Sequence, residues 1–213
     1  MELRGKDMKK NIMPILLIVV GLCLVGTGLG LKSYSKNKEA SLIKKFNEEI
    51  KLEKQNNTLN KQKGKEDKNR DGNKSGNKNE GISYGNELAL IEIPSIDLQS
   101  VIVEGMKKEQ LRYYLCHFEE TAMPGENGNF SIAGHSSFIY NEILNELYKV
   151  NVGDVIKLTT KKGEFNYYIT KKFIVEPNEI EVLNQDENKK TMTIVTCSNR
   201  GKKRLIVTAE MNQ

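Results

Sequence analysis

The chain has 213 residues, which suffices for one domain of about 100–150 residues together with additional segments. Its composition is polar, with 38% hydrophobic and 29% charged residues, and its net charge of +5 is unevenly distributed. Residues 32–80 carry a net charge of +6, whereas residues 81–213 carry a net charge of −3. The basic excess therefore lies outside the predicted folded domain, and it gives no support to nucleic-acid binding.

The N-terminal region predicts a membrane anchor. A short basic segment, residues 1–11, precedes an uncharged apolar segment, residues 12–31. About 20 apolar residues span a bilayer as a helix, whereas the apolar part of a cleaved signal peptide is usually about 7–15 residues long. Leu22, Val25 and Leu29 also interrupt the small residues that a cleavage site needs. A retained transmembrane signal-anchor over residues 12–31 is therefore the favoured interpretation, with a cleaved signal peptide as the alternative.

Residues 32–81 are predicted to connect this anchor to the folded domain. Within them, residues 36–58 place Leu42, Ile43, Phe46, Ile50 and Leu52 at helical spacing, which predicts a juxtamembrane amphipathic helix. The remainder is rich in Lys, Asn and Gly and nearly lacks apolar side chains. Such a segment buries too little surface to offset the entropy lost on ordering, so it is predicted to be a flexible basic linker.

Residues 82–213 are predicted to be the folded domain. Short runs of β-branched and aromatic residues, bounded by Gly, Pro and Asn, predict strands over 88–96, 98–105, 130–134, 155–160, 165–175, 191–197 and 204–211. Residues 107–115 predict helical turns, and residues 139–150 predict a helix with Ile139, Ile143, Leu144 and Leu147 on one face. Seven or eight short strands with few helices predict a mainly β fold, a closed or nearly closed barrel.

Three residues of this domain could form a thiol-based catalytic site. Cys197 ends one predicted strand, and His135 ends another. A nearby imidazole or guanidinium stabilises the thiolate that cysteine chemistry requires. Arg204 begins the strand after Cys197, so a hairpin would bring its five donors beside the thiol, where they can bind an oxyanion.

Other residues compete for these roles. Cys116 and His117 are adjacent in sequence and therefore point in different directions, so Cys116 is interpreted as a packing residue and His117 as a structural or rim residue. A Cys116–Cys197 disulfide remains an open alternative. Arg200 competes with Arg204, but it lies in the loop, whereas a strand register would fix the direction of Arg204. The scattered His and Cys residues lack metal-ligand spacing, so no metal or other cofactor is expected.

The domain also resembles a known family. TIVTC (193–197) resembles the TLxTC motif of sortases, RLIV (204–207) their arginine-bearing strand, and AGH (133–135) their histidine motif. The approach MPGENGNFSIAGH (123–135), the opening strands IEIPSIDLQSVIVEG (91–105) and the central VGDVIKLTT (152–160) are similar as well. The resemblance covers about residues 86–211 and is greatest to class D sortases, because the domain is compact and has no long C-terminal extension.

The resemblance implies an eight-stranded sortase-type β-barrel that cleaves an LPxTG-like sorting signal between Thr and Gly. Cys197 would form the thioester, Arg204 would hold the oxyanion, and His135 would protonate the leaving amine. Thr196 and Ser136, which adjoin the nucleophile and the histidine, would contact the substrate. A peptidoglycan amino group would then receive the secreted protein. Ser136 and Ser137 stand where class D members often carry Arg-Asp, which puts substrate preference in doubt more than catalysis.

The implied chemistry also sets the expected topology. Cell-wall attachment takes place outside a Gram-positive-type cell, so residues 1–11 would be cytoplasmic and the catalytic domain extracellular, on a single membrane pass. Two alternatives remain for the function. One is a thiol hydrolase of related fold, which would use water as the acceptor. The other is a non-catalytic, membrane-tethered β-barrel that binds wall or protein ligands.

Overall fold

The computed structural model describes residues 16–27, 37, 40–52, 54–55, 86–136 and 143–212. It divides into two compact units, Met1–Lys38 and Glu39–Gln213. In the first unit, residues 16–27 form a helix inside the predicted anchor, and the rest of that anchor lies outside the described residues. Of the helices described, none has both the length and the apolar character required to cross a membrane. The predicted linker before residue 82 also lies almost wholly outside the described residues.

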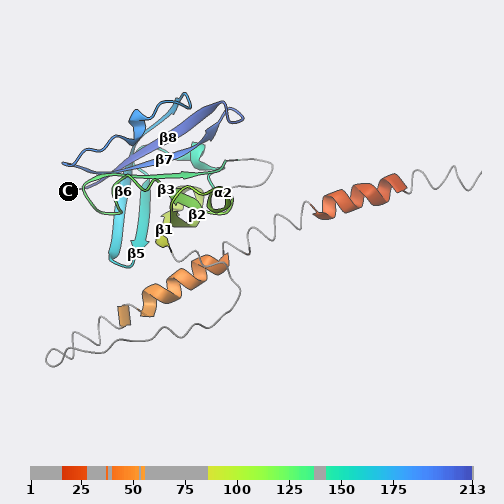
Figure 1. Cartoon of the computed structure of the whole chain (residues 1–213), viewed down its shortest axis with the longest axis horizontal. Helices are drawn as coiled ribbons and strands as arrows, with labels where there is room; N and C mark the ends of the chain where they lie inside the picture. Colours follow the sequence, from red (N-terminus) through yellow and green to blue (C-terminus); the bar gives the residue numbers. More distant parts are fainter. Residues whose placement is uncertain are drawn as a thin grey trace, which may run out of the picture. The chain divides into compact units, whose positions relative to one another are not determined.

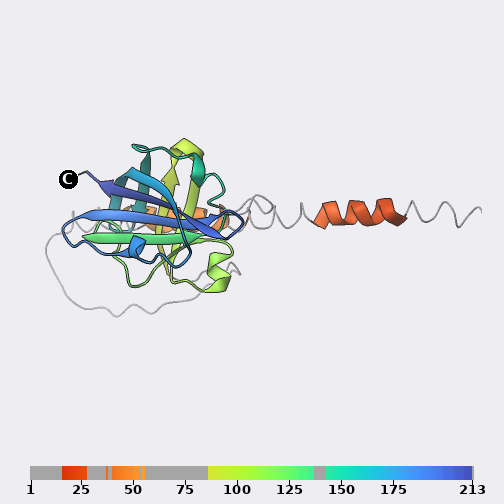
Figure 2. The same ribbon diagram turned by 90° about the horizontal axis from the view of Figure 1, so that it is seen from above.

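The second unit is built on a closed barrel of eight strands, which confirms the predicted fold class (Figures 1 and 2). Around the barrel the strands follow the order β1-β2-β3-β4-β7-β8-β6-β5. The sheet is mixed, because β2 pairs with β3, and β4 with β7, in parallel. The strands are β1 (Glu87–Ile93), β2 (Leu98–Glu104), β3 (Leu115–His117), β4 (Gly128–Gly134), β5 (Val155–Thr160), β6 (Gly163–Val175), β7 (Lys190–Ser198) and β8 (Lys203–Met211).

Helical structure in the barrel unit is limited to short pieces between strands and one longer N-terminal helix. The short pieces are η1 (Pro94–Ile96), α2 (Lys108–Leu111), η2 (Leu147–Lys149) and η3 (Glu181–Leu183). The helical turns predicted for residues 107–115 are therefore confirmed by α2. Strand β3 was not predicted, because three residues are too few to display an alternating pattern.

The helix predicted over residues 139–150 is wrong for its described part. Residues 143–146 form turns, and only Leu147–Lys149 are helical, in a single 3-10 turn. The Leu144 N–H donates to the His135 carbonyl, 3.2 Å away, while Leu147 and Val150 each donate to the residue three positions earlier. Leu144 and Leu147 are nevertheless fully buried in the barrel core. Their helix-like spacing therefore reflects core packing of a turn, and Ile139 lies outside the described residues.

Alternate side chains of the strands fill the barrel interior. Antiparallel and parallel strands send successive side chains to opposite faces, so every second residue points inward. The inward set includes Phe130 and Ile132 of β4, Met192 and Ile194 of β7, and Leu205, Val207 and Ala209 of β8. Burying each large side chain of this kind stabilises the fold by about 1.5–3 kcal/mol. The residues between them therefore lie on the outer face, where a site can form.

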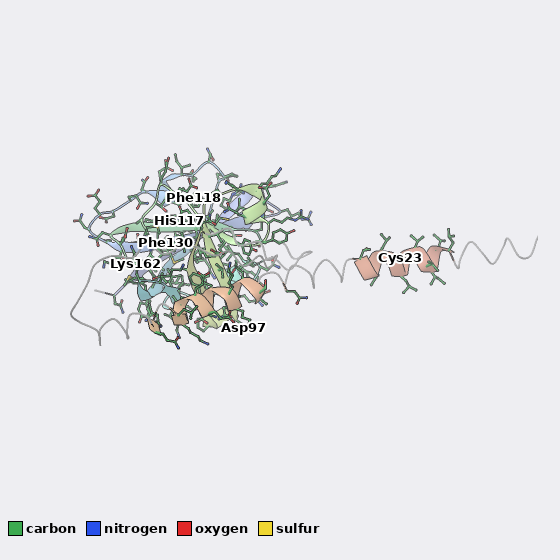
Figure 3. All side chains as sticks on the ribbon, turned by 60° about the horizontal axis from the view of Figure 1, so that its bottom comes forward. Cys23, Asp97, His117, Phe118, Phe130 and Lys162 are labelled. Carbon is green, nitrogen blue, oxygen red and sulfur yellow. The ribbon has the colours of Figure 1, made fainter. Side chains whose placement is uncertain are left out.

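The N-terminal helix over residues 40–52 packs on the outer face of the barrel (Figure 3). Leu42, Phe46 and Ile50 recur every four residues and are buried, at 5%, 1% and 5% exposure. They contact a patch formed by Leu90, Val101, Val103, Tyr114 and Cys116. Leu52 stays 60% exposed on the same helix. The apolar spacing of the sequence thus identified a real amphipathic helix, and the barrel wall is its partner.

Candidate active site

Strands β4 and β7 bring the histidine and the cysteine together. They run parallel, with Gly134 paired to Thr196 as their last register pair. Cys197 is the next residue on β7, and His135 is the first residue after the end of β4. Neighbouring strands lie about 4.8 Å apart, so these two residues occupy adjacent positions at one end of the barrel wall.

Strands β7 and β8 place the arginine beside the cysteine. In their antiparallel register, Cys197 is paired with Arg204 and Ser198 with Lys203. A hairpin of residues 199–202 joins them, as the short loop in the sequence predicts. The structure therefore pairs Cys197 with Arg204 and places His135 directly after the end of β4, the other strand next to β7.

Cys197 and Arg204 also share one face of the wall. Ile194 and Leu205 point into the core, so Cys197 and Arg204, at odd offsets from them, point outward. His135 follows the end of β4, and its side chain is exposed. Cys197 and Arg204 are half-buried, and Cys197 carries a free thiol. A polypeptide lying along this face could reach all three groups.

The guanidinium of Arg204 is hydrogen-bonded within its own hairpin. Its Nη1 donates to the carbonyl oxygens of Gly201, at 3.0 Å, and Lys203, at 3.1 Å. The hairpin itself is left-handed, because Asn199, Arg200 and Gly201 have φ values of 48°, 56° and 85°. Arg200 is exposed in this turn, whereas the register holds Arg204 opposite Cys197. A side-chain rotation would be needed to move the Arg204 guanidinium from the loop to a substrate.

Thr196 and Ser136 flank the site differently. Thr196 is buried, and its Oγ1 donates to the Gly134 carbonyl, 2.8 Å away. This bond joins β7 to β4 directly before Cys197 and His135. Ser136 is half-buried after His135. Their predicted contacts with substrate stay predictions, and Thr196 has in addition a clear part in holding the two strands in register.

Two supports of His135 could not be read from the sequence. A Cβ on Gly134 would lie 2.4 Å from Leu115 Cδ2 and 3.0 Å from Leu144 Cδ1, so a larger residue at this point of β4 would force these buried leucines to move. The Leu144 N–H, from the segment after the site, holds the His135 carbonyl. The sequence shows the glycine of AGH, but the requirement for a small residue there comes from Leu115, on strand β3. No pattern in the sequence indicates the Leu144 contact.

His117, the last residue of β3, is buried and lies apart from the candidate active site, which confirms its interpretation as a structural residue. It is fully buried beside Phe130, with ring centroids 5.0 Å apart (Figure 3). Nδ1 lies 3.0 Å from Glu104 Oε2, and Nε2 lies 3.0 Å from Thr121 Oγ1. Because the Thr121 hydroxyl already donates to the Phe118 carbonyl, Nε2 of His117 is the donor toward Thr121. Both ring nitrogens are therefore occupied by structural contacts.

Cys116 is a packing residue, as predicted. It is completely buried in the patch beneath the helix over residues 40–52, and it is free, as is Cys197. Burial raises the pKa of its thiol from 9.0 to about 12. Since the thiolate is the reactive form, Cys116 is unreactive at neutral pH.

We expect alkylation to distinguish the two cysteines of the barrel. At pH 8, iodoacetamide should modify Cys197 and leave Cys116 intact, as read by peptide mass mapping of the folded protein. The raised pKa of Cys116 also means that its contribution to stability is full below pH 9 and is lost as the pH rises toward 12, where the folded thiol ionises. Cys116 should therefore become reactive only with unfolding, and rapid modification at pH 8 would contradict its packing role.

Comparisons with known proteins agree with this geometry. A family model described as the sortase domain matches residues 91–212. The chain is 29% identical over 195 residues to Sortase D of Bacillus subtilis (strain 168), covering 88% of this chain and 89% of that protein. A solved Sortase D5 transpeptidase from Clostridium perfringens matches with a TM-score of 0.63 and 40% identity, over 85% of this chain and 99% of that one.

Sortase A from Corynebacterium diphtheriae matches with a TM-score of 0.56 and 28% identity, over 60% of this chain and 61% of that one. The family model covers more than half of the chain, and its residues include Cys197, His135 and Arg204. The chain therefore belongs to the sortase family and is a cysteine transpeptidase.

Proposed function

We propose that this sortase attaches secreted proteins to the cell wall, with Cys197 as nucleophile, His135 as general acid and Arg204 as oxyanion donor. The observation that carries the assignment is the register of β4, β7 and β8, in which Cys197 is paired with Arg204 and the last β4–β7 pair, Gly134 and Thr196, directly precedes His135 and Cys197. The alternatives His117 and Cys116 are both buried in the fold. Among the described residues of the barrel, Cys197 is the free thiol that is not fully buried, and His135 is the exposed imidazole.

The proposed substrate is an LPxTG-like sorting signal at the C-terminal end of a secreted protein. The Cys197 thiolate attacks the Thr carbonyl carbon, so a C–S bond forms and a tetrahedral oxyanion develops. As the intermediate collapses, the Thr–Gly C–N bond breaks, and protonated His135 gives its proton to the departing Gly amine. The product is a thioester between Cys197 and the Thr of the secreted protein.

Arg204 stabilises the oxyanion in this proposal. A guanidinium is permanently charged and presents fixed donors, which suits a developing negative charge. The Arg204 side chain donates to Gly201 and Lys203 in the free protein, and both bonds are exposed. Exchanging two solvent-exposed bonds to carbonyl groups for a charge-assisted bond to an oxyanion is favourable. Substrate binding therefore turns Arg204 from the hairpin toward Cys197.

A peptidoglycan amino group resolves the thioester, and the enzyme acts at the outer side of the membrane. Residues 12–31 are the proposed anchor, with residues 1–11 inside and the domain from residue 82 outside. Ser136 and Thr196 are proposed to flank the bound signal on either side of the catalytic residues. The lysines of residues 32–81 would lie near anionic lipid or wall polymers, and this electrostatic attraction would be screened by salt.

A peptide assay tests the function. The full chain is mixed with an LPxTG-like peptide, with and without a short peptide amine that mimics the cell-wall acceptor, and products are weighed by mass spectrometry. A transpeptidase yields the new amide when the amine is present. Cleavage to the free Thr acid alone, at equal rates with and without amine, would favour the thiol hydrolase. An unchanged peptide under both conditions would contradict this choice of substrate.

A further inference from the structure

Two separate segments of the chain lead into the barrel unit from the N-terminal side. The first along the sequence is the helix over residues 40–52, which packs on the barrel wall. Its buried side chains, Leu42, Phe46 and Ile50, complete a cluster with β1, β2 and β3. Two ion pairs extend the contact to the β5–β6 hairpin, one to its turn and one to the start of β6. Lys161 Nζ lies 3.1 Å from Glu49 Oε2, and Lys54 Nζ lies 3.2 Å from Glu164 Oε1.

The second is β1, the first strand of the barrel, and it begins close to the end of this helix. In the strand register, Leu90 of β1 is paired with Thr159 of β5, which in turn is paired with Glu164 of β6. Glu164 is also the partner of Lys54, near the end of the helix. The segment between residues 55 and 86 therefore starts beside β6 and finishes at β1, the two strands that flank β5. Its length cannot influence the position of the barrel while the helix is packed.

We infer that the docked helix, and not the long linker, sets how far the catalytic barrel can stand from the membrane. This inference rests on the membrane anchor of the proposed function. With the helix docked, only residues 32–39 separate the anchor from the barrel unit, and they extend to at most about 28 Å. Were the helix undocked, residues 32–86 would separate them and could extend to about 190 Å.

The docked helix therefore leaves a short tether, residues 32–39, between the anchor and the barrel, although 55 residues lie between the anchor and β1. A domain confined near the bilayer meets substrates that are themselves attached to the bilayer at a high effective concentration. Soluble peptides gain nothing from this confinement. The docked helix therefore favours polypeptides that are still anchored at the membrane surface over those already released.

Energy transfer in the full chain, reconstituted in liposomes, tests the inference. The donor is a fluorophore coupled to a click-reactive amino acid that replaces Val152, a residue 68% exposed. The acceptor is a lipid with a fluorophore on its headgroup. Inserting roughly 20 Gly/Ser residues after Ser75 should leave the transfer efficiency unchanged. This insertion leaves the packed cluster intact, so it stays informative even if core variants fold poorly. A fall in transfer upon insertion would overturn the inference.

Phe46→Asp should release the helix from the barrel, because a carboxylate cannot remain in the buried cluster. Transfer should fall by at least about half, and the same insertion should then lower it further. Leu52→Asp, on the exposed side of the same helix, is the matched control and should behave like the unaltered protein. Turnover of a lipid-anchored LPxTG-like peptide should fall several-fold in Phe46→Asp, with turnover of the soluble peptide unchanged. Equal transfer in Phe46→Asp and Leu52→Asp would overturn the inference.

Liposome flotation separates this inference from the proposed function. A chain that fails to float with liposomes would overturn the membrane anchor and, with it, the tether. A chain that floats while its transfer follows the linker length would overturn only the tether. The soluble-peptide assay reports the catalytic assignment independently of both.

Discussion

Replacing Cys197 by Ala should lower the rate of transpeptidation at least about 10³-fold and leave the barrel folded. Without the sulfur no thioester can form, so neither amide product nor acyl-enzyme should appear. The side chain is half-buried on the outer face and is absent from the core cluster, so the midpoint of thermal unfolding should change little. Mass spectrometry of the protein mixed with peptide and thermal denaturation followed by circular dichroism measure the two effects.

Cys116→Ala is the matched control for this variant. It removes a thiol of the same domain that lies beneath the N-terminal helix, so it should reduce stability modestly and preserve the turnover per folded molecule. The non-catalytic alternative makes the opposite forecast, since a binding module would keep its function without Cys197. Retention of peptide cleavage by Cys197→Ala would therefore disprove the proposed mechanism.

Replacing Arg204 by Ala should lower kcat by about 10²–10³-fold, because an oxyanion donor is lost from the transition state. KM should change less, since the oxyanion does not exist in the bound substrate. Arg204→Lys keeps the charge without the fork of donors and should recover only part of the rate. Single-turnover measurement of acyl-enzyme formation isolates the step concerned.

Arg200→Ala separates the two arginines of the hairpin. Arg200 is exposed, with φ of 56°, and should leave kcat within about twofold. Loss of the two Arg204 bonds to Gly201 and Lys203 should cost at most about 1 kcal/mol each, because both are exposed. An Arg204→Ala enzyme with normal kcat, or a strong defect in Arg200→Ala, would refute the assignment.

The barrel was largely predictable because strand structure depends on neighbours along the chain. Alternating apolar residues in VIKLTT and TMTIVTC indicate which face is buried, and the strands β5 and β7 follow them closely. The same logic fails for short or irregular segments. The helix predicted over residues 139–150 was wrong for its described part, residues 143–150, because Leu144 and Leu147 have helical spacing but are buried by turns. Strand β3 was missed since its three residues show no period.

The candidate site was predictable in part for a related reason. Cys197 and His135 end strands, and strand ends gather at a rim, so their meeting followed from position. The family resemblance added the same residues independently, and their catalytic roles remain predictions for the variants above. The supports of the site were not predictable, because the Thr196 bond to Gly134 and the fit of Gly134 against Leu115 join distant parts of the chain.

By itself, the sequence determined the β-barrel class, the family and the three residues most suited to thiol chemistry, since each leaves a local pattern of period, turn or motif. Only the tertiary structure decided that His117 is buried, that the Arg204 guanidinium rests on its hairpin, and that the helix over residues 40–52 seals Cys116 against the wall. An amphipathic helix reveals that it needs an apolar partner but not which one. That choice depends on surfaces assembled from strands far away in the chain, which exist only after the barrel has closed.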